Sequence, residues 1–123
     1  MNKTLLPLIG LSVAASLLMG CGGTSPMVKE RVAKSETAVQ QATATVGNSE
    51  SGAVELQRAK DNLATAQAQL KSKNEKNAER FAQKAQLDAE LAIAKSQSSA
   101  ARKAADEVLA SVETLRREAA RPQ

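Results

Sequence analysis

The sequence predicts an all-α protein, an alanine-rich antiparallel helical hairpin that a long C-terminal helix extends into a three-helix arrangement. Alanine, the best helix former, is abundant after residue 30. Aromatic residues are nearly absent, with one Phe and neither Tyr nor Trp. No Gly or Pro interrupts residues 53–121. Because large apolar side chains are scarce, we expect helices that pack closely through small residues, not the core of a small enzyme.

Residues 1–20 have the layout of a signal peptide. A positive start containing Lys3 is followed by an apolar run from Leu5 to Leu18. The run is about 14 residues long, shorter than the ~20 that a membrane-spanning helix needs. The following Leu-Met-Gly-Cys sequence, residues 18–21, resembles the lipobox of bacterial lipoproteins, although Met19 stands where a smaller residue is usual.

The lipobox resemblance implies cleavage between Gly20 and Cys21, followed by acylation of the Cys21 sulfur and of the new amine with fatty acids such as palmitate. Two or more buried chains anchor a protein stably, whereas one binds reversibly. The alternative is an ordinary cleaved signal that leaves a free thiol, since a single Cys forms no intrachain disulfide. Gly22, where an inner-membrane lipoprotein would carry Asp, favours the outer membrane and its periplasmic face in a Gram-negative host. Residues 21–25 would form the lipidated tether.

The helical domain is expected over residues 26–121, and its first helix over about 26–46. Ser25 suits an N-cap and Pro26 the first helical position. The apolar positions follow heptad spacing: Val28, Val32, Ser35, Val39, Ala42 and Val46. A loop rich in Gly, Ser and Asn follows at 47–52.

The second helix is expected over about 52–72, with Ser51 as a possible N-cap. Its apolar positions alternate leucine and alanine: Leu56, Ala59, Leu63, Ala66 and Leu70. A tight turn is predicted at 72–75, where Ser72 and Glu75 have capping-box spacing and Asn74 is an alternative cap. The competing interpretation is one continuous helix from 53 to 121.

The third helix is expected over about 75–120 and carries two apolar seams. The first seam is Ala78, Ala82, Ala85, Ala89 and Ala92, with Phe81 beside it. The second is Leu87, Leu91, Ala94, Ser98, Ala101, Ala105, Val108, Val112, Leu115 and Ala119. Because the first two helices are too short to cover the third, we expect an unpartnered stripe from Ser98 onward, with Ala101, Ala105, Val108, Val112 and Leu115 as partner-binding residues. The alternative is a frayed, partly helical tail.

The residue types offer no catalytic or metal-binding constellation. The chain lacks His, so the usual metal ligand and general base are missing, and we expect a protein that is not an enzyme and has no metal or cofactor. Asp88, beside the alanine seam, is interpreted as part of a surface ion pair, with Lys84 one turn back as the candidate partner, in preference to a functional carboxylate. The formal charge of +4 falls to +3 once Lys3 is removed, and interleaved charges without aromatic residues speak against nucleic-acid binding.

Two runs of spaced residues carry a family resemblance. They are Leu56, Ala59, Leu63, Ala66 and Leu70, and then Ala78, Phe81, Ala82, Ala85, Asp88, Ala89, Glu90, Leu91 and Ala92. Over roughly residues 26–105 the chain resembles the bacterial lipoproteins of domain-of-unknown-function family 4398. That resemblance implies an alanine-rich helical hairpin behind a lipobox, and no established activity.

These observations predict a membrane-anchored periplasmic lipoprotein that serves as a non-catalytic structural or adaptor module through helix–helix contacts. The expected partner is an envelope protein or a second copy of the chain, which the C-terminal helix would bind. The alternative is a basic helical module that binds an anionic envelope component, such as lipopolysaccharide or peptidoglycan. It would use cationic residues around the turn between the second and third helices: Lys71, Lys73, Lys76, Arg80 and Lys84.

Overall fold

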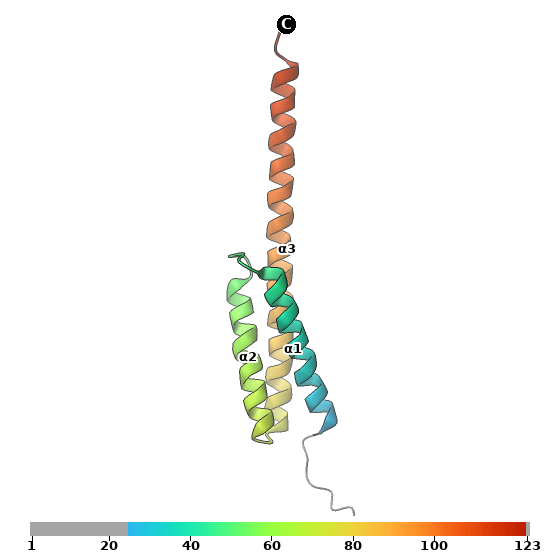
Figure 1. The fold of residues 1–123 in the computed structure, drawn as a ribbon, viewed down its shortest axis with the longest axis vertical. Coiled ribbons are helices and arrows are strands. Elements are labelled where there is room, and N and C mark those ends of the chain that lie inside the picture. Colours follow the sequence, from blue (N-terminus) through green and yellow to red (C-terminus); the bar gives the residue numbers. More distant parts are fainter. Residues whose placement is uncertain (1–24, 123) are drawn as a thin grey trace, which may run out of the picture.

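Three helices account for nearly all of residues 25–122, the part of the chain that the computed structural model describes. They are α1 (Pro26–Val46), α2 (Ala53–Lys71) and α3 (Glu75–Ala119). Figure 1 shows α1 and α2 beside the first half of α3, which continues far beyond them. The helices alternate in direction along the chain, so α2 runs antiparallel to both others. The predicted all-α class with a long last helix is confirmed, whereas the predictions for the signal peptide, Gly20 and Cys21 fall outside the described residues.

Helix α1 buries the heptad seam that its sequence predicts. Its buried residues are Val28, Val32, Ser35, Val39, Ala42 and Val46, and all six were expected. The polar member of the seam, Ser35, is fully buried because its hydroxyl donates a hydrogen bond to the Val32 carbonyl at 2.7 Å. A buried hydroxyl that is bonded to its own helix carries no unsatisfied donor, so it fits the seam in place of an alanine.

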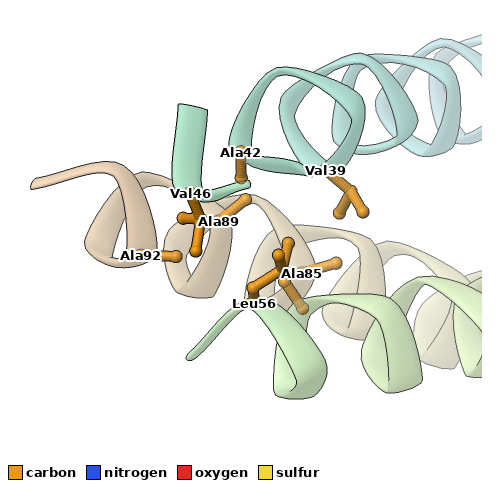
Figure 2. Close-up of a cluster of buried hydrophobic side chains, with 8 residues drawn as sticks. Val39, Ala42, Val46, Leu56, Ala85, Ala89 and Ala92 are labelled. Atoms are coloured by element: carbon orange, nitrogen blue, oxygen red, sulfur yellow. The ribbon is translucent and has the colours of Figure 1, made fainter. Parts of the chain in front are cut away.

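The core is built from alanine on α3, mainly valine on α1, and leucine together with alanine on α2. Figure 2 shows Val39, Ala42 and Val46 of α1 and Leu56 of α2 meeting the alanine seam of α3. The seam residues Ala78, Ala82, Ala85, Ala89 and Ala92 are each 0% exposed. On α2, Leu56, Ala59 and Ala66 are buried, and Leu63 and Leu70 are half-buried. Small side chains on α3 let both neighbouring helices approach its backbone closely, as the sequence predicts.

A sharp turn separates α2 from α3, so the interpretation of residues 53–121 as one continuous helix is wrong. Lys73 lies in the turn with a φ of +59°, in the left-handed region. The backbone N–H of Asn74 donates to the Gln69 carbonyl at 2.9 Å, which closes the end of α2. The predicted tight turn is therefore present, and α2 ends within one residue of the expected position.

The side-chain caps expected at the helix starts are wrong. Ser25 and Asn74 occupy N-cap positions but make no side-chain cap, and Gly52 takes the α2 cap position in place of Ser51. The Ser72 hydroxyl bonds the Gln69 carbonyl instead of forming a capping box. Tertiary contacts explain two of these differences. Glu75 Oε1 accepts a hydrogen bond from the Ser25 backbone N–H at 2.7 Å, and the Ser51 hydroxyl bonds the Lys95 carbonyl at 3.2 Å.

Candidate functional site

The α1–α2 loop crosses α3 near Ala92 and marks where the covering of α3 ends. Gly52 has a φ of +90°, and a Cβ atom placed on it would lie 2.4 Å from the Ala92 carbonyl oxygen. The loop thus rests its backbone directly on the α3 backbone, which only glycine permits. Ser96 is the last buried residue of α3. Beyond this point, α3 has no neighbouring helix among the described residues.

A network of charged and polar side chains joins α2 to α3 just below this edge. Lys95 Nζ donates a hydrogen bond to Glu55 Oε1 at 2.6 Å, and Arg58 lies 3.5 Å from the same carboxylate. Arg58 also reaches Asp88 at 3.7 Å, and Asn62 donates to Asp88 at 2.9 Å. Asp88 therefore pairs with residues of α2. The expected pairing with Lys84 is wrong, because the Lys84 ammonium lies over the Phe81 ring, 5.3 Å from its centroid.

The network is a structural clamp, and sequence reasoning missed its central residue. Glu55 is 7% exposed although it is charged, because it lies between Lys95 and Arg58. An open pocket of about 590 Å³ adjoins it, but Glu55 and Lys95, which both line this pocket, are already paired with each other. Among residues 25–122, no three acidic or other ligating side chains gather to hold a metal ion. The sequence offered one sign that Glu55 is buried: it directly precedes Leu56, so it lies at the edge of the apolar seam of α2.

The pKa of Glu55 is lowered from its ordinary value of 4.5, chiefly by the hydrogen bond from Lys95, and then by its own backbone N–H and the nearby charges of Lys95 and Arg58. These effects outweigh burial, which raises the pKa. A carboxylate whose pKa is lower in the folded state stabilises the fold above its unfolded pKa. It loses that contribution as pH falls through the folded value.

The Glu55→Gln variant should therefore differ in its pH dependence of stability. At pH 7 we expect the variant to be less stable than the parent protein, because the paired carboxylate is gone. The gap should begin to narrow below about pH 4.5, the ordinary value of the carboxyl, and should close only once the pH falls below the lowered pKa of the folded state, where Glu55 in the parent is protonated as well. Urea unfolding followed by circular dichroism between pH 3 and pH 7 measures the gap. A gap of constant size across this range would show that the Glu55 carboxylate does not stabilise the fold.

Helix α3 carries two apolar stripes on opposite faces. The covered seam includes Ala85, Ala89, Ala92 and Ser96, and the second stripe has a residue two positions after each of them. Two residues correspond to about 200° of rotation on an α-helix, so the second stripe points away from α1 and α2. We call it the outer stripe, and all its members are exposed: Leu87, Leu91, Ala94, Ser98, Ala101, Ala105, Val108, Val112, Leu115 and Ala119.

The outer stripe begins earlier than the sequence prediction. It was expected to be uncovered from Ser98 onward. Leu87 and Leu91 are already 58% and 44% exposed because they lie on the side of α3 that faces away from α1 and α2. The predicted partner-binding residues Ala101, Ala105, Val108, Val112 and Leu115 do share one face, and all are exposed. Leu109, at 67% exposed, lies beside them and was not predicted.

The opposite face of the projecting part of α3 is polar. Continuing the heptad spacing of the covered seam past Ser96 gives Ser99, Lys103, Asp106, Ala110, Glu113 and Arg117. The covered seam therefore turns polar where its covering ends, whereas the outer stripe stays apolar to the end of the helix. Residues 100–122 are all exposed, and α3 remains helical to Ala119, so the frayed-tail alternative does not describe the structure.

These features define a class: an alanine-packed helical hairpin whose last helix projects beyond it with one apolar face. The family model described as a domain of unknown function (DUF4398) matches residues 30–108. The chain belongs to this family, and the match runs from within α1 through α2 and along α3 as far as Val108. Neither the curated proteins nor the solved structures contain a match to the chain. None of the helices within residues 25–122 combines the length and apolar character needed to cross a membrane.

Proposed function

We propose that the protein is a membrane-anchored envelope lipoprotein that acts as a non-catalytic structural or adaptor module, binding a partner helix along the outer stripe of α3. The observation that carries this proposal is the continuous exposed stripe from Leu87 to Ala119, which faces away from α1 and α2. The opposite face of the projecting part of α3 is polar. A helix with one apolar face stabilises itself by burying that face against another element. A heptad-spaced stripe suits a second helix better than a small ligand.

The anchor in this proposal is Cys21, by its resemblance to a lipobox. Ser25, four residues later, is bonded to Glu75 at the start of α3, so only four residues separate the proposed anchor from the turn end of the hairpin. Helix α3 starts at this end, and its 45 residues reach roughly 68 Å at 1.5 Å per residue. The lipid would thus hold the hairpin at the periplasmic face of the outer membrane while the outer stripe projects away from it.

A double substitution on the outer stripe tests the proposal. Ala101→Glu with Ala105→Glu places two carboxylates at the centre of the expected interface, where an unpaired buried charge costs about 3–5 kcal/mol. We expect crosslinking of intact cells followed by affinity capture to recover partner protein at least about tenfold less efficiently. The variant should remain folded and anchored because both positions are exposed.

The matched control is Ala110→Glu, an exposed position on the polar face of the same part of α3. It adds the same kind of charge without entering the outer stripe, so capture should stay at the parent level. If the double variant captures its partners as well as Ala110→Glu does, the outer stripe is not the interface.

A second candidate function is supported by the position of the basic residues. Lys71, Lys73, Lys76, Arg80 and Lys84 are exposed and lie at or near the α2–α3 turn, the end where Ser25, four residues after the proposed anchor, bonds Glu75. Cations held at an anionic surface each contribute about 1 kcal/mol within a Debye length. Binding of the protein to lipopolysaccharide or peptidoglycan through these residues should be lost in 0.5 M salt, and binding that persists there would contradict it.

A further inference from the structure

The spacing and flanking residues of the outer stripe identify its occupant. We propose that it is the outer stripe of a second copy of this chain, aligned parallel and in register as a two-stranded coiled coil over residues 87–119. The proposal rests on the proposed membrane anchor and deepens it by naming the partner. The stripe repeats in steps of four and three along its whole length, which is the seam of a left-handed coiled coil.

The anchor determines the direction of the two copies. In each copy, α3 begins at the end where Glu75 bonds Ser25 at the start of α1, and it projects past the opposite end, near Ala92. Two copies held in one membrane therefore project their α3 helices in the same direction. In an antiparallel pair, the hairpin of one copy would lie beside the projecting end of the other copy's α3. That hairpin would be roughly 68 Å, the length of α3, from the membrane that holds its lipid.

Charges beside the stripe favour the same arrangement. In a parallel, in-register pair, the residue directly before Leu91, and every seventh residue after it, faces the residue five positions later in the other copy. Glu90 then faces Lys95 of the second copy, and Ala104 faces Leu109, which accounts for this exposed leucine beside the stripe. Lys95 is within reach because its side chain is half exposed while it binds Glu55.

The antiparallel alternative brings like charges together. When the two outer stripes overlap fully in opposite directions, Arg102 faces Arg102 and Glu90 faces Glu118. Its one attractive flanking pair is Asp88 with Arg116, and the Asp88 side chain is only 21% exposed, against 50% for Lys95 in the parallel form. Like charges in facing positions disfavour a pairing, so the charge pattern selects the parallel form.

The small size of the interface explains why the dimer depends on anchoring both copies in one membrane. A stripe of 33 residues is about 50 Å long and roughly 10 Å wide, so the dimer buries on the order of 1,000 Å², at the lower limit for a stable complex. Alanine and serine fill half of the stripe, so the contact is weak in dilute solution. Anchoring both copies in one bilayer raises their effective concentration and makes such a contact sufficient.

Single cysteines in the full-length protein in cells test this dimer. Ala94→Cys and Ala119→Cys lie near opposite ends of the stripe, and each faces its own counterpart only in a parallel, in-register pair. We expect both variants to form disulfide-linked dimers in the oxidising periplasm, at least about tenfold more than the control Ala110→Cys on the polar face. Failure of both variants to link, or equal linking by the control, would overturn the proposal.

The same experiment separates failure of the dimer from failure of the proposed function. The parent protein has one Cys, which is blocked if it is acylated, so a disulfide-linked parent dimer would show that the lipid anchor is absent. If the stripe variants do not link but Ala101→Glu with Ala105→Glu still abolishes capture, the occupant is a helix of another protein. In that case the dimer is wrong and the adaptor function stands.

Discussion

Replacing Gly52 by alanine is expected to destabilise the hairpin by about 3 kcal/mol or more. Two effects combine at this residue. Its φ of +90° is one that other residues rarely adopt, and the added Cβ would lie 2.4 Å from the Ala92 carbonyl oxygen and 3.2 Å from the Ala92 Cα. Both atoms belong to the α3 backbone, so neither can move without displacing the helix. The loop would have to lift off α3 and expose the core below it.

Gly47→Ala is the matched control, and unfolding by urea or heat, followed by circular dichroism, is the measurement. Gly47 also has a positive φ, of +51°, but nothing lies within 4 Å of the position that its Cβ would take. Its substitution should cost only the backbone strain, about 1–3 kcal/mol. Equal losses in the two variants would mean that close contact between the loop and α3 contributes nothing.

Replacing Ala89 by glutamate is expected to cost about 3–5 kcal/mol, a large part of the stability of a domain of this size. Ala89 is 0% exposed and packs in the cluster that includes Val39, Val46 and Leu56. A glutamate there is too large for the space between the helices and brings a charge without a partner. The hairpin should melt far below the parent protein, or should not fold.

Ala101→Glu provides the comparison on the same helix. It makes the same chemical change 12 residues later at an exposed position, where a substitution typically alters stability by less than about 0.5 kcal/mol. Thermal unfolding of the two variants measures the difference directly. A marked loss of stability in Ala101→Glu, measured in detergent where the copies are apart, would show that the projecting helix packs against something within its own chain.

The repeat of small and branched residues is sufficient to predict most of this fold. Heptad spacing selects every buried residue of α1 and all five alanines of the α3 seam, because burial on a helix follows its 3.6-residue period. The same spacing, applied to the two seams of α3, implies that they lie on opposite faces, since they are offset by two residues. Exposure of Leu87 and Leu91 could have been predicted from that offset.

The remaining features depend on contacts between residues distant in the sequence. Glu55 is buried because Lys95, 40 residues later, meets it across the α2–α3 interface, and local pattern gives no sign of that pairing. The same holds for Ser25 with Glu75 and for Ser51 with Lys95. Lys73 takes a left-handed conformation that favours glycine or asparagine, so residue type does not indicate its role in the turn.

The proposed function depends most on the outer stripe being covered in the envelope, and cysteine labelling measures this directly. Ala105→Cys lies on the outer stripe and Ala110→Cys on the polar face, and in the isolated chain both are exposed. We expect a maleimide added to cells with a permeabilised outer membrane to react with Ala110→Cys at least about tenfold faster, and at equal rates with both after urea unfolding. Equal rates before unfolding would show that the outer stripe is bare in the cell and would contradict the proposed function.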